Sequence, residues 1–387
     1  MTAGTAQVSL ATVLREWGRI GCVGFGGPPA HIKLLRELCV ERRGWISAAE
    51  FEDAIAACNL LPGPASTQLS IFCAWRVRRR LGAVVGGLAF IGPGLVLILA
   101  LSALFLAGSP PKWVLGAGAG AGSAVAAVAV QAGWDLLRPS WQRRRRTIRW
   151  IAYLVAGVVA AATVGAWLVL VLLGCGLAEL VIERPYRRPT GDGGHASVAV
   201  GPAATAAFGI STLGALAWVA FKVGALSYGG GFVIIPLMQS DAVDRYHWAT
   251  AHQFLNAVAL GQITPGPVVH TVAAVGYAAA GVGGGLLAAT VAFSPSFAFV
   301  LLGAAHFDRL RGNLVVRAFL GGAGPAAIGA ILGSAIPLAG ALSEGWQFAV
   351  LAGAALLLLA LRRGVVLTLL AAAAVGVVVA VAGGPLP

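Results

Sequence analysis

Two Pro-Gly-Pro tripeptides interrupt apolar stretches of the chain, at Pro62-Gly63-Pro64 and Pro265-Gly266-Pro267. Proline frees backbone groups from a helical hydrogen-bond ladder, and lipid cannot satisfy them. Each break must therefore face protein or a water-filled cavity. Because proline favours the start of a helix, the amides that follow it would point at the break and attract anions. These amides belong to Ala65, Ser66, Thr67, Val268, Val269 and His270. The pattern predicts an anion site, and a packing kink is the plainer alternative.

Two basic residues stand in the apolar segments that precede the breaks. Lys222 is the only charged residue between positions 203 and 240, and Arg19 lies 203 positions before it. A basic side chain held deep in a membrane costs about 3 kcal/mol unless it is paired or used. Snorkelling or a structural ion pair is the alternative. Two cations and two helix termini together predict a site for a doubly charged anion.

Further groups around the breaks suit an oxyanion. Phe25-Gly26-Gly27 and Tyr228-Gly229-Gly230 follow the two cations, and glycine permits the close backbone approach that amide binding needs. Neutral hydrogen-bonding side chains also flank the breaks: Asn59, Ser66, Thr67, Gln68, Gln262, Thr264, His270 and Thr271. Roughly half of them are expected to do no more than satisfy freed backbone groups.

Acidic residues near the breaks occur in one copy alone. Glu52 and Asp53 approach the first break, whereas the second copy has a leucine and an asparagine at those positions. This asymmetry leads to a hypothesis of proton coupling through Asp53 or Glu52, with His270 as an alternative relay. An interfacial position beside Arg43 and Trp45 would explain the two acids equally well.

Other chemistries lack their signatures. No G-x-x-x-x-G-K-S/T loop occurs, and the five cysteines form no Cys-x-x-Cys pair. We therefore expect no cofactor, no metal, no catalytic residues and no enzymatic activity, and we expect that this chain alone is not driven by ATP.

Composition places most of the chain in lipid. Charged residues make up 11% of it and hydrophobic residues 58%, and the mean hydropathy is +0.86. Uncharged stretches long enough for a bilayer core of roughly 30 Å recur at 81–107, 113–134, 151–178, 318–343, 345–361 and 364–387. Because 148–182 is too long for one span, we divide it near Gly165. The formal charge of +13 comes from arginines in short loops, which indicates topology setting rather than nucleic-acid binding.

An internal repeat runs through the chain at constant register. Trp45, Phe51 and Pro62 correspond to Trp248, Phe254 and Pro265, and each pair is 203 positions apart. Residues 1–183 and 203–387 therefore form two repeats. The basic, Pro- and Gly-rich segment 184–202 reads as a cytoplasmic linker.

Arginines fall in non-matching loops of the two repeats. Arg76 and Arg78 to Arg80 follow the first break, but 277–285 has no basic residue. By the positive-inside rule, matching loops face opposite sides of the membrane. The predicted fold is an all-α polytopic membrane protein with two inverted repeats, each with about five crossings and a re-entrant segment broken at Pro-Gly-Pro. Secondary transporters are commonly built on this plan, with binding near the midplane.

The motifs FGGPPAHI, ERRGWISAAEF and LLPGP, with YGGGFVIIPL and GQITPGPV in the second repeat, resemble the chromate ion transporter family, in its long two-domain form. The resemblance covers both repeats. It implies export of chromate, with sulfate as a similar oxyanion, across the bacterial cytoplasmic membrane. Its paired motifs fall on the two cations, the two aromatic-Gly-Gly triplets and the two breaks.

We therefore expect a secondary transporter of divalent oxyanions that exposes a midplane site alternately to the two sides. A sulfate importer or exchanger, and a membrane protein without transport activity, are the alternatives. The bilayer and the anion are the expected partners, and a homodimer is left open.

Overall fold

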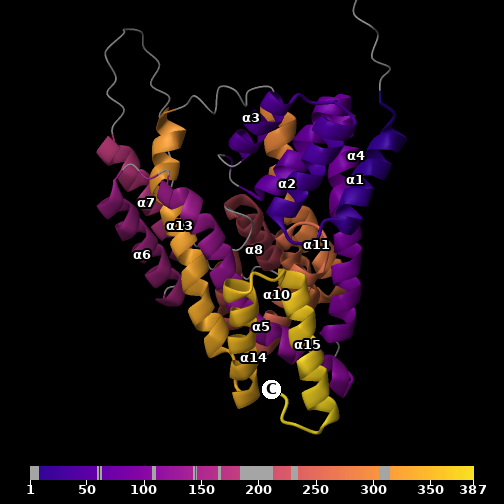
Figure 1. Ribbon diagram of the computed structural model, residues 1–387, viewed down its shortest axis with the longest axis vertical. Coiled ribbons are helices and arrows are strands. Elements are labelled where there is room, and N and C mark those ends of the chain that lie inside the picture. Colours follow the sequence, from indigo (N-terminus) through magenta and orange to yellow (C-terminus); the bar gives the residue numbers. More distant parts are fainter. Residues whose placement is uncertain are drawn as a thin grey trace, which may run out of the picture.

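Segments rich in small and apolar residues form helices throughout the computed structural model (Figure 1). The structure describes residues 8–58, 61, 63–106, 110–142, 144, 146–163, 167–183, 212–227, 234–304 and 314–387, and no strand occurs among them. The predicted linker, Asn59, Pro62 and the Tyr228-Gly229-Gly230 triplet lie outside the described residues. The all-α prediction is confirmed.

In the part of the chain that the structure describes, four helices are long and apolar enough to cross a membrane: Ala65–Phe105, Lys112–Gln142, Val268–Gly303 and Leu314–Gly340. Shorter apolar helices accompany them. Large apolar side chains such as Val155, Leu170 and Leu367 are exposed on outer helix faces, where water would disfavour them and lipid would not. The chain is a multi-pass membrane protein.

The first repeat contains eight described helices. They are α1 (Leu10–Val23), α2 (Pro28–Arg36), the π-helix η1 (Glu37–Arg42), α3 (Ala48–Cys58), α4 (Ala65–Phe105), α5 (Lys112–Gln142), α6 (Thr147–Thr163) and α7 (Leu168–Glu183). The structure describes α6 up to Thr163 and α7 from Leu168, and Gly165, where the division is expected, lies outside the described residues.

The second repeat follows the same order. Its helices are α8 (Thr212–Leu226), α9 (Ile234–Gln239), the π-helix η3 (Ser240–Arg245), α10 (Ala251–Ile263), the 3₁₀-helix η4 (Val268–His270), α11 (Thr271–Gly303), α13 (Leu314–Gly340), α14 (Gly345–Ala355), the π-helix η6 (Leu356–Ala360) and α15 (Val365–Val381). Local geometry recurs at the sequence register: η1 and η3 begin 203 positions apart, as do α3 and α10.

The long helices α4 and α11 each fold back on themselves. Arg78 and Arg79 leave the helical region in α4, and Ala280 and Gly281 do so with similar angles in α11. Beyond each turn the two segments pack together through small residues. A Cβ at Gly86 would meet Ala74, and one at Gly284 would meet the carbonyl of Gly276. A two-residue turn therefore replaces the loop expected after each broken segment.

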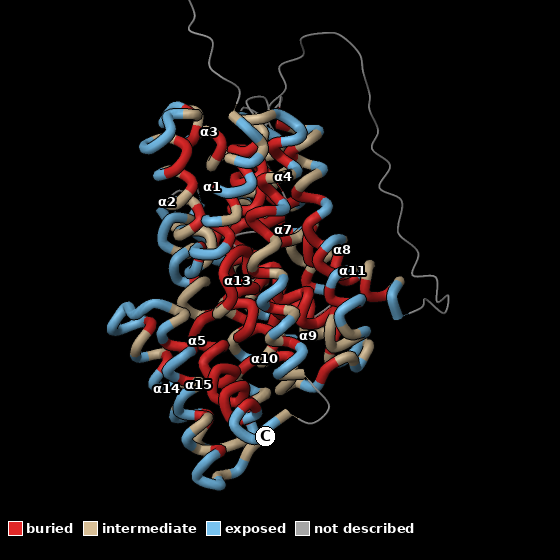
Figure 2. The backbone as a smooth tube through the Cα atoms, turned by 90° about the vertical axis from the view of Figure 1, so that its right-hand side faces the viewer, coloured by how far each residue is buried: buried red, intermediate tan, exposed pale blue. Residues whose placement is uncertain are grey.

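The two repeats interleave. The pair α6 and α7 packs on α13 of the second repeat, while α14 and α15 pack on α5 of the first. Figure 1 shows α13 beside α6 and α7, and α15 close to α5. Buried residues run along the middle of the molecule in Figure 2. The last helices of each repeat thus cover the partner repeat, and the centre holds the segments with the two breaks.

Candidate anion site at the two helix breaks

The first break is the tip of a helical hairpin. The helix α3 leads into it and the first segment of α4 leads out. Glu50 at the start of α3 forms an ion pair with Arg76 at the end of that segment. The two arms therefore run antiparallel, and both outer ends lie at the same level. This geometry is that of a segment that enters and returns.

Each break starts a new helix. Pro64 is the N-cap of α4, and Pro267 is the N-cap of η4, which continues into α11. Of the three amides expected to be free at each end, the third is not free. The amide of Thr67 donates to the Pro64 carbonyl at 3.0 Å, and that of His270 donates to the Pro267 carbonyl at 2.9 Å. The prediction is corrected at the third amide of each break, because both helices open with a tight turn, and it stays a prediction for the first two amides.

Each break packs on the opposite repeat. The amide of Gly266 donates to the carbonyl of Gly24, which caps α1, at 2.9 Å. A Cβ at Gly63 would approach the carbonyl of Gly224 and the hydroxyl of Ser296, both at 3.4 Å, in α8 and α11. The two breaks therefore meet in the centre of the molecule across the boundary between the repeats.

The first Gly-Gly pair adjoins the second break. Gly26 and Gly27 have φ of 97° and 72°, a region open to glycine, and Gly27 caps α2. A Cβ at Gly27 would lie 4.0 Å from Val268. Phe25, in contrast, is 43% exposed. The glycines meet the expectation of close backbone approach, and a role for the aromatic ring stays a prediction.

His31 joins the two breaks. Its ring is fully buried, with Nε2 2.9 Å from the Gly24 carbonyl and Nδ1 3.2 Å from the Ser66 hydroxyl. The Gly24 carbonyl is the same one that accepts from Gly266. A continuous set of hydrogen bonds thus runs from Ser66, after the first break, through His31 and Gly24 to Gly266 in the second.

Buried polar atoms without partners gather around this connection. Several residues near the breaks have a buried side-chain atom that makes no hydrogen bond with any described residue: Thr67, Ser70, Ser227, Gln262, His270 and Ser296. The ring of His270 does face the Ile91 backbone, although not with ordinary hydrogen-bond geometry. An unsatisfied buried polar group costs about 1–3 kcal/mol, so such a concentration favours a binding site for a polar ligand.

Some of the other predicted neutral side chains already have hydrogen-bond partners in the protein, as expected for part of that group. Thr264 and Thr271 donate their hydroxyls to the carbonyls of Leu260 and Val268 at 2.9 and 2.8 Å. Gln68 is fully buried beside Gly63. Both hydroxyls are therefore satisfied by backbone carbonyls beside the second break, and Ser66, Thr67 and Gln262 remain as candidates to contact a ligand.

Lys222 is not free. Its Nζ lies 2.5 Å from Oδ2 of Asp241, a fully buried carboxylate, and the lysine side chain is itself 13% exposed. The repeat register places a leucine, Leu38, where Asp241 stands in the second repeat. The ion pair kept as an alternative in the sequence is therefore what forms, and the expectation of a lysine available to the anion is corrected.

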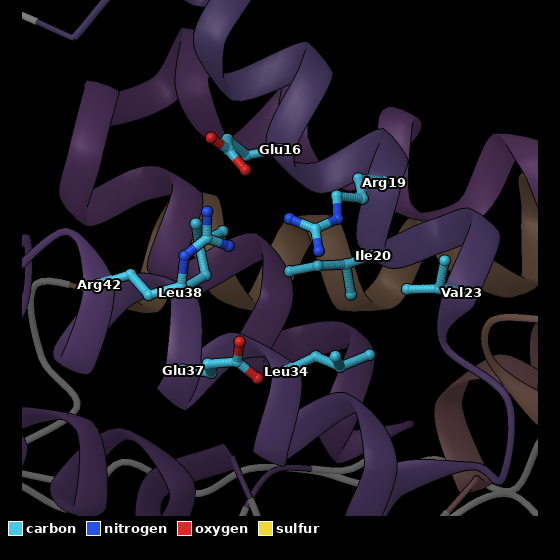
Figure 3. Close-up of a pocket in the computed structure, with 8 residues that line it drawn as sticks. All are labelled: Glu16, Arg19, Ile20, Val23, Leu34, Glu37, Leu38 and Arg42. Carbon is cyan, nitrogen blue, oxygen red and sulfur yellow. The ribbon is translucent and has the colours of Figure 1, made fainter.

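Arg19 is exposed and lies in a small pocket of about 30 Å³ on the first repeat. Figure 3 shows its guanidinium between the carboxylates of Glu16 and Glu37, across from Arg42. Glu16 is already held by Arg43 at 2.6 Å. The two predicted cations thus do not converge on the breaks, because Lys222 pairs with Asp241 and Arg19 lines a separate pocket.

The comparisons with known proteins agree with the motifs. The family model "Chromate transporter" matches residues 11–180 and 214–377. Chromate transport proteins of Cupriavidus metallidurans and Pseudomonas aeruginosa are 32% and 31% identical to this chain, covering 87% and 84% of it and 85% and 80% of their own length. A probable chromate transport protein of Synechococcus elongatus is 30% identical over 85% of this chain and 84% of its own. No solved structure matches.

The chain belongs to the chromate transporter family. The two matched segments begin 203 positions apart, at the register of the internal repeat. The recognition drawn from the sequence motifs is confirmed, and with it the assignment to transport proteins.

The acidic residues proposed for proton coupling lie in the middle of α3 in this family member. Glu52 pairs with Arg36 and its side chain is 55% exposed, while Asp53 is half-buried. Neither reaches the tip of the hairpin, which is about two to three helical turns further along. Their part in coupling stays a prediction.

Sequence reasoning missed His31 and Asp241 in this transporter family member. His31 lies within FGGPPAHI, four residues after the glycine that caps α2, and a histidine at that place was a visible signal. Asp241 is the first acid after Lys222 and could have been paired with it by charge alone. Both contacts depend on tertiary packing that the repeat register does not reveal.

Proposed function

We propose that this protein is a secondary transporter of chromate and of similar divalent oxyanions such as sulfate, and that it exports them across the bacterial cytoplasmic membrane. The observation that carries the proposal is the meeting of two helix breaks in a buried centre rich in unsatisfied donors. Amides at the breaks, the Ser66 and Thr67 hydroxyls and the Gln262 amide are the kinds of group that bind tetrahedral oxyanions. Family membership supports the choice of chromate.

Alternating exposure of this centre to the two sides of the membrane is part of the proposal. Ser66, Thr67, His270 and Gln262 are between 0% and 8% exposed, so these four side chains are shielded from solvent. A site closed to both sides is one state that alternating access requires. The contact of each break with the opposite repeat supplies a surface along which one repeat could move against the other.

An inverted orientation of the two repeats is part of the same proposal. The hairpin turn of α4 carries Arg78 and Arg79, whereas the matching turn of α11 carries Ala280 and Gly281. In Figure 2, α2 and α3 lie in the upper half and α9 and α10 in the lower half. Opposite placement of matching elements is what an inverted repeat produces, and the arginines mark the first turn as cytoplasmic.

Flux through reconstituted protein tests the proposal. We expect purified protein in liposomes to carry radiolabelled sulfate and chromate down an imposed gradient, with each anion competing against the other. The double variant Thr67→Val with Gln262→Leu should lower flux at least about tenfold, a loss of about 1.4 kcal/mol or more in anion binding. Both changes remove unsatisfied groups without creating new ones, so the fold should persist.

A matched control is Ser102→Ala. Its hydroxyl is buried and unsatisfied among the described residues, but it lies about two helical turns beyond Gly94, which abuts the second break. Flux should be unchanged in this variant. Tight anion binding without flux would reject a transporter, and sulfate flux that chromate fails to inhibit would favour the sulfate alternative.

A further inference from the structure

The anion site has an unmet electrostatic requirement. A doubly charged anion buried among neutral donors loses its hydration, and a compensating positive charge is needed to offset much of that cost. Lys222 is neutralised by Asp241, and Arg19 lies in a separate exposed pocket with Glu16 and Glu37. Within the described part of the chain, the positive charge must therefore come from another source.

The hydrogen bonds of His31 fix where a proton can enter it. The Gly24 carbonyl can only accept, so Nε2 of His31 carries a hydrogen and donates to it at 2.9 Å. In the neutral ring Nδ1 is then the acceptor, and the Ser66 hydroxyl donates to it at 3.2 Å. The free lone pair of the imidazole thus points at Ser66, the second residue after Pro64 at the first break.

We propose that a divalent oxyanion binds at the breaks together with a proton that His31 takes up at Nδ1; this inference rests on the proposed function. The proton comes from aqueous solution and adds to the Nδ1 lone pair. The new N–H donates to the Ser66 oxygen, and the Ser66 hydrogen turns to donate to an oxygen of the anion. No covalent bond breaks in the protein, and the net charge of the loaded site falls from −2 to −1.

His270 strengthens the coupling between anion binding and proton uptake. Its buried ring lies against Gly266, where a Cβ would come within 3.0 Å of Cε1, and it senses the charge on His31. Two imidazolium groups repel each other in an empty site, and a dianion between the breaks removes that repulsion. His31 is the first to take a proton, because both its ring nitrogens keep a partner when it is charged.

The remaining titratable groups on the packed elements do not compete for this role. On α1, Glu16 and Arg19 face the separate pocket, and on α2, Lys33 is exposed. On α4, Arg76 pairs with Glu50 at the outer end of the hairpin. On α10, His252 is at the helix start, where it senses Glu344 rather than the breaks. Among these packed elements, the proton on the site belongs to the two histidines.

Anion binding as a function of pH tests the inference. Binding of radiolabelled sulfate to the full-length protein in nanodiscs is measured between about pH 5.5 and about pH 7.5, on both sides of the pKa of an unperturbed histidine. Sulfate is the probe because it stays doubly charged over this range, whereas chromate is itself partly protonated. We expect the affinity to rise by up to about tenfold per unit of falling pH, as linkage to one proton requires.

His31→Gln is the decisive variant. Glutamine can donate to the Gly24 carbonyl but cannot take up a proton, so the affinity should become much less dependent on pH and lower at acidic pH. Ser66→Ala should lower the affinity while keeping the pH dependence, since the ring still titrates. His252→Gln is the matched control and should bind as the unaltered protein does.

Calorimetry in two buffers of different ionisation enthalpy counts the protons directly. We expect about one proton taken up per sulfate by the unaltered protein and a clear decrease in His31→Gln. Sulfate binding with no pH dependence and no proton uptake would overturn this inference and leave the transporter intact. Absence of sulfate and chromate binding at every pH would instead reject the proposed function.

Discussion

Arg19 and Lys222 occupy the same register of the two repeats, yet their surroundings make them different groups. Asp241 buries a carboxylate against Lys222, whereas Leu38 stands at the matching position of the first repeat and Arg19 is exposed beside Glu16 and Glu37. A buried ion pair contributes little net stability, but removing one member leaves the other charge uncompensated. The duplicated cation is therefore evidence for common descent of the repeats rather than for a shared role at the anion.

Removal of Lys222 tests this reading. We expect Lys222→Met alone to destabilise the protein by about 3–5 kcal/mol, because Asp241 would remain buried and unpaired. The double variant Lys222→Met with Asp241→Leu should recover most of that loss. Thermal unfolding of the purified variants measures both effects. A stable single variant, or a double variant no more stable than the single one, would show that the pair is not what holds these helices.

The types of residue at the breaks could be read from the sequence, and their contacts could not. Proline and glycine restrict the backbone by themselves, so the position of each break and its free amides follow from local chemistry. The bond from His31 to Gly24 joins α2 to the end of α1, and the orientation of Lys222 depends on a turn that brings Asp241 beside it. Such contacts are fixed by packing between elements.

At the scale of elements, each break depends on a glycine with positive φ. Gly63 and Gly266 have φ of 114° and 93°, and the amide of Gly266 holds the Gly24 carbonyl. The sequence predicted these breaks and the division between α6 and α7. It did not predict the π-helices or the tight turn at Arg78 and Arg79, because no proline or glycine marks that turn in the first repeat.

Alanine at the two break glycines should impair transport without unfolding the protein. A Cβ in this backbone region costs about 1–2 kcal/mol, and the strain would move the amide of Gly266 away from Gly24. We expect Gly266→Ala and Gly63→Ala each to lower sulfate flux at least about tenfold. Gly92→Ala is the control, because Gly92 is helical and a Cβ there meets nothing within 4 Å. Normal flux in both break variants would contradict a role for this geometry.

At the scale of the whole molecule, the last helices of each repeat pack on the other repeat. The α6–α7 pair of the first repeat packs on α13 of the second. Helices α14 and α15 of the second repeat pack on α5 of the first, and each break contacts the opposite repeat. The repeat boundaries follow from the constant register in the sequence. The packing of these last helices on the opposite repeat does not follow from the sequence, because the apolar composition of α6 and α14 does not specify which long helix they contact. Neither repeat is expected to complete the anion site alone.

Opposite orientation of the repeats gives the last prediction. Glu41 in η1 and Asp244 in η3 are both exposed and are 203 positions apart, so they occupy matching places on the two repeats. In a Cys22→Ser background, which removes the exposed cysteine, we introduce Glu41→Cys or Asp244→Cys. A membrane-impermeant thiol reagent added to intact cells should label one variant, and the other should react only after the membrane is opened.

The arginines at the turn of α4 place that turn on the cytoplasmic side. We expect η1 on the same side, because Arg36, at the end of the helix that leads into η1, pairs with Glu52 of α3. Asp244→Cys is therefore the variant expected to react from outside. Labelling of both cysteines from the same side would show that the repeats are parallel, and an inverted transport mechanism would then have to be abandoned.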